Sequence, residues 1–136
     1  MKAHVVTQVP KRVLLYAIEQ AKQAELSAVL QKLSIEEYTL SADELGQDVG
    51  YLAGFPGFVK KESALCEPPH CNGVMCMCGL SNVLMDELLN ALKENEISIP
   101  LKAIVTATNQ SWSFGELTRE LIKEREAIAL SLQNRN

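Results

Sequence analysis

The segment from Leu101 to Glu126 constrains the fold more than any other part of the chain. An apolar run at 103–105 is followed by a polar turn and then by a helical pattern that opens on Ser113 and Glu116. A serine placed three residues before a glutamate is the capping box that begins many helices. A strand, a short turn and an amphipathic helix in this order are typical of α/β domains, which often place a ligand at such a joint.

Two kinds of apolar pattern alternate along the rest of the chain. Short continuous runs predict strands buried on both faces, whereas apolar residues at every third or fourth position predict helices. We therefore expect an α/β fold, a single layered domain with a mainly parallel sheet of about four strands flanked by helices. The sequence shows no internal repeat and no low-complexity segment. The expected strands are 13–18, 36–40, 74–78 and 103–105, and helices are expected to follow Ile18, Ser41, Ser81 and Ser113.

A chain of 136 residues fits one domain. Between Gly54 and Gly73 the prolines and glycines leave no clear element, apart from a candidate edge strand at 58–60. Such a stretch is long for a compact domain and is typical of a functional or a mobile loop, unless it contains an element that the pattern does not show. The expected divisions of the chain are a flexible arm at 1–10, the α/β domain at 11–130 and a disordered tail at 131–136.

Composition narrows the classes of function. The net charge is −4 and no cluster of Lys and Arg exceeds a pair, whereas nucleic-acid binders present a basic surface. No apolar run has the length of a membrane span, and there is no secretory signal. No P-loop or G-x-G-x-x-G motif points to a cofactor. We expect a cytoplasmic protein, without nucleic acid, membrane or cofactor, whose four cysteines are thiols.

Polar residues follow the third and fourth expected strands. Ligands of parallel sheets bind at the carboxyl ends of the strands, and the helix after Ser113 would add free amides that favour an anion. Alternatively these residues only shape turns, with Asn109 in an Asx-turn and Trp112 packed onto the helix. The candidate ligand-binding residues are Gly79, Ser81, Thr106, Thr108, Asn109 and Trp112.

Cys78 is the candidate catalytic residue. It would lie at a strand end beside a helix start, a position that can lower the pKa of a thiol. Cys76 and Cys78 could equally fill the core, since free cysteine is among the most buried residue types. Cys66, His70 and Cys71 offer a second candidate site in the loop, for a metal or for redox chemistry, although their spacing matches no zinc motif.

Several segments carry a family resemblance. They are KAIVTATNQSW with the F-x-E-L-x-x-E-L-x-x-E helix after it, DELGQDVGYLAG, and the M-C-G-L-S turn with its leucine-rich helix. Together they resemble a bacterial domain family of unknown function whose members are often labelled amidotransferases. The resemblance spans most of 13–126 and implies a small α/β domain without an established substrate. Glutamine amidotransferases resemble one another in a G-x-C-x-G elbow with a downstream histidine, and no histidine follows Cys78 here.

The function that the sequence favours is a binding or regulatory module, with a small polar or anionic ligand or a partner protein at the strand ends. One alternative is an amidotransferase-like or thiol enzyme that uses Cys78, and another is the loop site of Cys66, His70 and Cys71. A homodimer is compatible with each of these, because a four-stranded sheet has two open edges.

Overall fold

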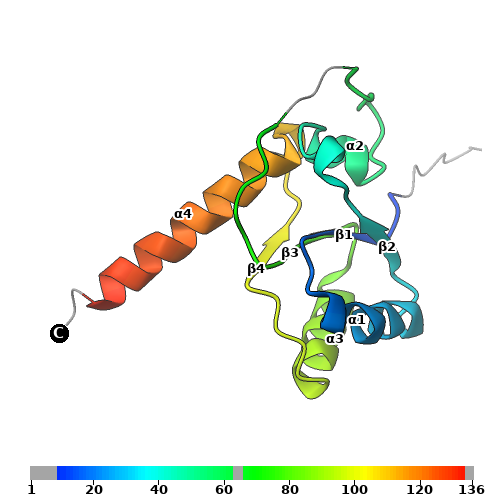
Figure 1. Ribbon diagram of the computed structural model, residues 1–136. Helices are drawn as coiled ribbons and strands as arrows, with labels where there is room; N and C mark the ends of the chain where they lie inside the picture. The colour runs from blue at the N-terminus through cyan, green and yellow to red at the C-terminus, as the bar shows by residue number, and fades with distance from the viewer. Residues whose placement is uncertain (1–8, 63–65, 134–136) are drawn as a thin grey trace, which may run out of the picture.

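The computed structural model describes residues 9–62 and 66–133 (Figure 1). Within these ranges, strands and helices alternate as the sequence predicts. The elements are β1 (Arg12–Tyr16), α1 (Gln20–Lys32), β2 (Glu36–Thr39), the 3₁₀ turn η1 (Ala42–Glu44), α2 (Val49–Leu52), β3 (Val74–Cys78), α3 (Asn82–Glu94), β4 (Leu101–Ile104), the 3₁₀ turn η2 (Asn109–Ser111) and α4 (Phe114–Gln133).

The four strands form one sheet in the order β2-β1-β3-β4. The pairs β1–β2 and β3–β4 are parallel, whereas the central pair β1–β3 is antiparallel. The α/β class and the mainly parallel sheet are therefore confirmed. Because the β1–β3 pair is antiparallel, the carboxyl ends of β1 and β2 lie at one end of the sheet and those of β3 and β4 lie at the other.

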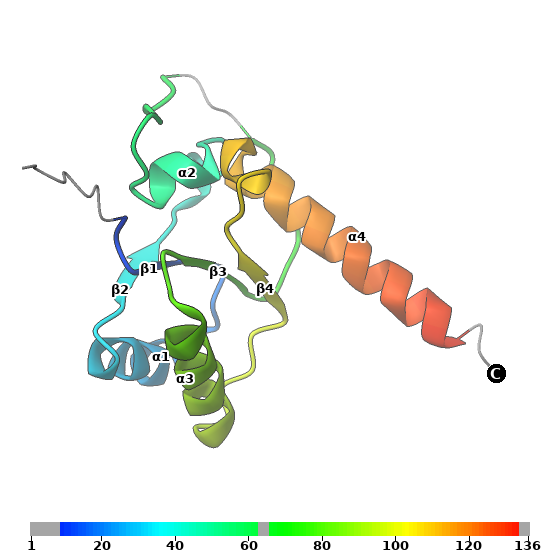
Figure 2. The ribbon, with the colours of Figure 1, turned by 180° about the vertical axis from the view of Figure 1, so that it is seen from behind.

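Helices cover both faces of the sheet (Figures 1 and 2). On one face, α1 and α3 pack through leucines such as Leu26 and Leu88 onto Val13, Leu15 and the strand methionines. On the other face, α2 and the first turns of α4 cover Leu14, Cys76 and Cys78. Both central strands are thus buried on two faces, which explains why they read as continuous apolar runs.

The two halves of the chain have the same architecture, although the sequence shows no internal repeat. Each half runs strand, helix, parallel strand, 3₁₀ turn and helix. In the first half Arg12 pairs with Glu36 and Leu15 with Thr39; the corresponding pairs of the second half are Val74–Leu101 and Met77–Ile104. Residues 98–100 have no counterpart in the first half, and this insertion together with low identity hides the repeat in the sequence.

An approximate two-fold axis relates the halves. It passes between Leu14 and Cys76, which are corresponding residues and directly opposite partners at the centre of the β1–β3 pair. Asp48 and Ser113 are also corresponding residues, and they pair as an isolated antiparallel bridge. The starts of α2 and α4 therefore meet at the same axis as the central strands.

The halves differ most in their last helix. Val49 begins a helix of 4 residues, whereas Phe114 begins one of 20 residues that extends away from the sheet (Figure 2). The capping box at Ser41 is present but opens η1 rather than a helix, and the candidate strand at 58–60 does not form. α4 includes residues 131–133 of the expected tail, while the expected arm at 1–8 lies outside the described residues.

The loop between α2 and β3 is held against both halves. The side chain of Gln47 donates to Lys61 O and accepts from Lys61 N, both at 2.9 Å, and Lys61 Nζ lies 2.7 Å from Asp48 Oδ1. Further along, Arg119 donates to the backbone oxygen of Glu67. In the part of the chain that the structure describes, none of the helices has the length and apolar character that a membrane crossing requires.

Candidate functional site

The turn after β4, where most of the predicted ligand-binding residues lie, is closed by its own side chains. Asn109 accepts from Thr106 N at 2.8 Å and donates to Ile104 O at 3.1 Å, and Asn109 N donates to Thr106 Oγ1 at 3.0 Å. Trp112 packs against the core, and its carbonyl accepts from Val49 N at 2.8 Å. These polar groups shape the turn, while Thr108 is exposed.

Gly79 and Ser81, predicted to bind the same ligand, follow β3. Gly79 has a positive φ of 70°, and a Cβ there would lie 2.3 Å from Pro10 O. Ser81 caps α3 by accepting from Leu84 N at 3.1 Å. Both residues follow the carboxyl end of β3 and lie at the same end of the sheet as the Thr106–Trp112 turn. Each of them has a structural role within the chain. Whether any of the predicted residues binds a ligand stays a prediction.

Cys78 has the surroundings of a core thiol. Cys78 and Cys76 are both fully buried, and their sulfur atoms lie 4.0 Å apart. The hydrogen bond with Cys76 and the burial both raise the pKa of Cys78 far above that of a free thiol. A reactive cysteine requires an accessible thiolate, so this environment does not favour Cys78 as a nucleophile.

The three loop residues proposed for a metal or redox site are held by different contacts. The Cys66 sulfur lies against Gly115 and accepts from Arg119 Nη1 at 3.6 Å. Cys71 packs against the sheet, and His70 is exposed. In the described ranges 9–62 and 66–133, no group of three or more His, Cys, Asp or Glu side chains could hold a metal ion.

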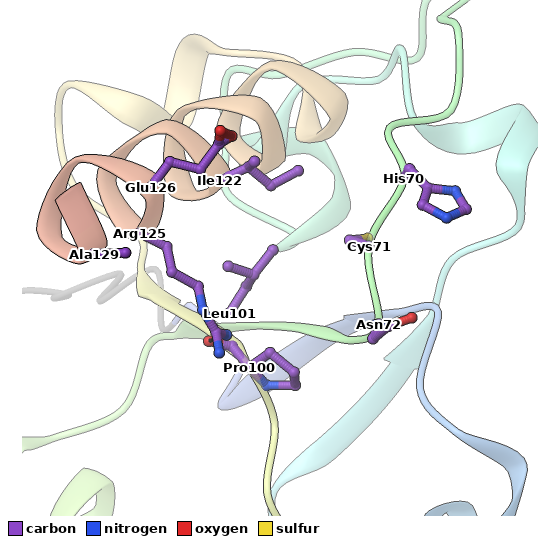
Figure 3. Close-up of a pocket in the computed structure, with 9 residues that line it drawn as sticks. All are labelled: His70, Cys71, Asn72, Pro100, Leu101, Ile122, Arg125, Glu126 and Ala129. Atoms are coloured by element: carbon purple, nitrogen blue, oxygen red, sulfur yellow. Dashed lines mark hydrogen bonds between the residues drawn. The ribbon is translucent and has the colours of Figure 1, made fainter. Parts of the chain in front are cut away.

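A cavity of about 350 Å³ lies between the end of the loop and α4 (Figure 3). One wall is the segment His70–Asn72, and the opposite wall is the face of α4 that carries Ile122 and Arg125. The floor is the start of β4. The lining residues are His70, Cys71, Asn72, Pro100, Leu101, Ile122, Arg125, Glu126 and Ala129.

The cavity combines an apolar lining with one cation, Arg125, and one carboxylate, Glu126, both of them exposed. Leu101, Ile122 and Ala129 supply apolar surface, and Arg125 extends from α4 toward the start of β4 (Figure 3). Arg125 Nη1 donates to Pro100 O at 3.0 Å. Among the described residues, no carboxylate lies within ion-pair distance of this guanidinium. The guanidinium of Arg125 therefore keeps N–H groups that could donate hydrogen bonds to a carboxylate or phosphate.

This cavity and the predicted site lie at opposite ends of strands β3 and β4. Asn72 and Pro100 precede β3 and β4, so the cavity is at the amino ends of these strands. The sequence analysis named His70 and Cys71 for other chemistry and missed Arg125. The helical spacing of Ile122, Arg125 and Ala129 places them on one side of α4, but no local pattern indicates which distant segment faces that side.

Within residues 9–62, the first half has no helix that corresponds to the α4 wall of this cavity. Leu52 and Leu117 are corresponding residues, yet the helix ends at the first and continues for four more turns after the second. The residues that would correspond to the α4 wall belong to the loop after α2. The cavity described here thus lies where the two-fold symmetry is broken.

Comparison with known proteins gives one match. Curated proteins and solved structures yield none that is significant. A family model matches residues 73–128, which begin just before β3 and end within α4, and thus contain much of the cavity. That family has no assigned activity, so the amidotransferase label stays a prediction. The second half of this chain is therefore similar to the family described as domain of unknown function (DUF3783).

Proposed function

We propose that the protein is a small-molecule binding module whose ligand occupies the cavity between His70–Asn72 and α4. The ligand class is a small carboxylate or phosphate that carries an apolar group. The observation that carries this proposal is Arg125, a guanidinium without a carboxylate partner among the described residues, in a cavity with an apolar lining.

The size and lining of the cavity support this reading. Ligand pockets usually measure about 300–1,000 Å³ and combine apolar walls with a few polar groups, so this cavity suits a small ligand. The anionic group would accept hydrogen bonds from Arg125, and the apolar group would contact Ile122 and Ala129. The sequence predicts the same class of function, with a small polar or anionic ligand or a partner protein, but at the other end of strands β3 and β4.

The test is a ligand screen with matched variants. Thermal unfolding is followed with a panel of small carboxylates and phosphate esters, each with a short aliphatic or aromatic group. A binder raises Tm by an amount that grows with the logarithm of the ratio of ligand concentration to Kd, and it should do so for the wild type. Arg125→Gln should lose at least tenfold in affinity, because it removes a charge-assisted hydrogen bond. Lys123→Gln is the control, since it removes one positive charge from the same helix outside the cavity.

The position of binding is checked by amide chemical shifts in NMR spectra. Shifts should change first at Asn72, Leu101 and Ile122. If no compound of the panel binds, or if Arg125→Gln binds as tightly as Lys123→Gln, the proposed function is wrong. Shift changes confined to Thr106–Trp112 would instead support the site predicted from the sequence.

A further inference from the structure

We propose that the two halves of the chain are copies of one unit and that the surface between them is self-complementary. The second half would then fit a second copy of itself, carried by another chain, as well as it fits the first half. The family model matches the second half alone. The first half, residues 12–52, is a divergent copy of the same unit.

Backbone hydrogen bonds repeat from one half to the other. At the end of α1, Ile35 N donates to Leu30 O at 2.9 Å, and at the end of α3, Ile97 N donates to Leu92 O at 2.8 Å. The residue before each of these isoleucines has a positive φ, 59° at Ser34 and 55° at Glu96. A non-glycine residue in this region is uncommon, so its repetition at corresponding positions is a specific similarity.

Side chains at corresponding positions are also shared. Leu26, Leu30 and Ile35 correspond to Leu88, Leu92 and Ile97, and all six are buried in the same cluster. On the other face, Gly50 and Gly115 occupy the same position in α2 and α4. A side chain of the connecting loop packs against each glycine: Phe58 lies against Gly50, and Cys66 lies against Gly115.

The contacts across the axis are those of a two-fold interface. Val49 N donates to Trp112 O at 2.8 Å, and the corresponding Phe114 N donates to Gln47 O at 3.0 Å. In a two-fold interface, if one residue contacts a second, then the copy of the first contacts the copy of the second. The interface between the halves follows this rule in its strands and in its helix starts.

The side chains nearest the axis differ between halves, and their sizes compensate. Leu14 is larger than its counterpart Cys76, while Val49 is smaller than its counterpart Phe114. All four are fully buried in one cluster. Two second halves would place two cysteines and two phenylalanines around the axis, and this keeps the total volume close to that of the present set. Cores tolerate such volume-conserving changes well.

The packing is tested in the full chain with L14C/V49F. This variant gives the first half the axis residues of the second half, so the axis is lined as in a pair of second halves. The single variants should each lower the urea midpoint, L14C by leaving a cavity and V49F by overpacking. The double variant should recover most of the combined loss. The control L14F/V49C contains the same residue types in exchanged positions and should recover none.

The association is tested in the full chain with Leu14→Asp, which places a charge at the axis and prevents the first half from covering β3. Light scattering after gel filtration should show a dimer, with β3 of one chain paired with β3 of another. The control Leu14→Asp/Cys76→Asp places a charge at the axis in both halves and should not dimerise. The proposal is overturned if L14C/V49F is no more stable than its control. It is equally overturned if Leu14→Asp is monomeric, aggregates or behaves like the double variant.

Discussion

Asp48 and Ser113 pair with each other across the approximate two-fold axis, and each directly precedes a helix. The bridge fixes the starts of α2 and α4 side by side above the central strands. The two helices differ after this point, where α2 ends at Leu52 and α4 continues to Gln133. The continued part of α4 forms one wall of the cavity proposed as the ligand site.

The turns after β1 and β3 provide a matched pair of glycine substitutions. Ala17 and Gly79 correspond to each other and have positive φ values of 58° and 70°. Ala17→Gly should raise the free energy of unfolding by about 0.5–1 kcal/mol, because it relieves a left-handed conformation that alanine disfavours. Gly79→Ala should lower it by about 2 kcal/mol or more, since its Cβ would lie 2.3 Å from Pro10 O. Urea unfolding measures both, and a stabilised Gly79→Ala would contradict the close approach.

The Asn109 side chain should matter for stability rather than for ligand affinity. Asn109→Ala removes the acceptor for Thr106 N and the donor to Ile104 O, which leaves backbone groups without partners. We expect a loss of about 2 kcal/mol in the free energy of unfolding. Gln110→Ala is the control, because its side chain makes only a long contact of 3.4 Å and should change stability by less than about 0.5 kcal/mol. A ligand whose affinity falls with Asn109→Ala at unchanged stability would restore the turn as a binding site.

Thiol labelling distinguishes the core cysteines from the loop cysteines. Cys76 and Cys78 are fully buried, whereas Cys66 and Cys71 are half-buried. Labelling of the native protein with iodoacetamide, followed by peptide mapping, should modify the loop cysteines first. Cys78 should react only at the rate of unfolding, since burial and the hydrogen bond with Cys76 raise its pKa. Rapid labelling of Cys78 in the native protein would instead support the thiol-enzyme alternative, and Cys78→Ser would then be the variant to test.

The sequence predicts the strands and the long helices because their apolar patterns are local. The run at 74–78 and the stripe of Leu84, Leu88 and Leu92 determine β3 and α3 with little help from the rest of the chain. The direction of β1 against β3 depends instead on the path of the 53–73 loop, for which the sequence has no signal. The cavity was missed for the same reason, as Arg125 and Asn72 meet only through that path. The repeat was missed because its shared residues are few and are divided by the 98–100 insertion.

The pair Tyr38–Glu44 should make stability depend on pH in the alkaline range. The Tyr38 hydroxyl donates to Glu44 Oε2, and this hydrogen bond, together with burial, raises the pKa of Tyr38 to about 12. A tyrosine in the unfolded chain has a pKa of about 10, which is lower than the pKa of Tyr38 in the folded protein. Between these values the unfolded chain binds fewer protons than the folded one, so stability present below about pH 10 is lost as the pH rises toward about 12.

Tyr38→Phe separates this contribution from other alkaline effects. The variant lacks the titrating hydroxyl, so its urea midpoint should fall less steeply than that of the wild type between about pH 10 and about pH 12. At the acid end, burial of Glu44 opposes its ionisation, but hydrogen bonds from Tyr38 and Ser41 outweigh burial and lower the pKa of Glu44. The stability from Glu44 is therefore present above the pKa of an unfolded glutamate, about 4.3, and is lost as the pH falls through the lower folded value. Equal alkaline slopes in wild type and Tyr38→Phe would show that the hydroxyl is not held by Glu44 in solution.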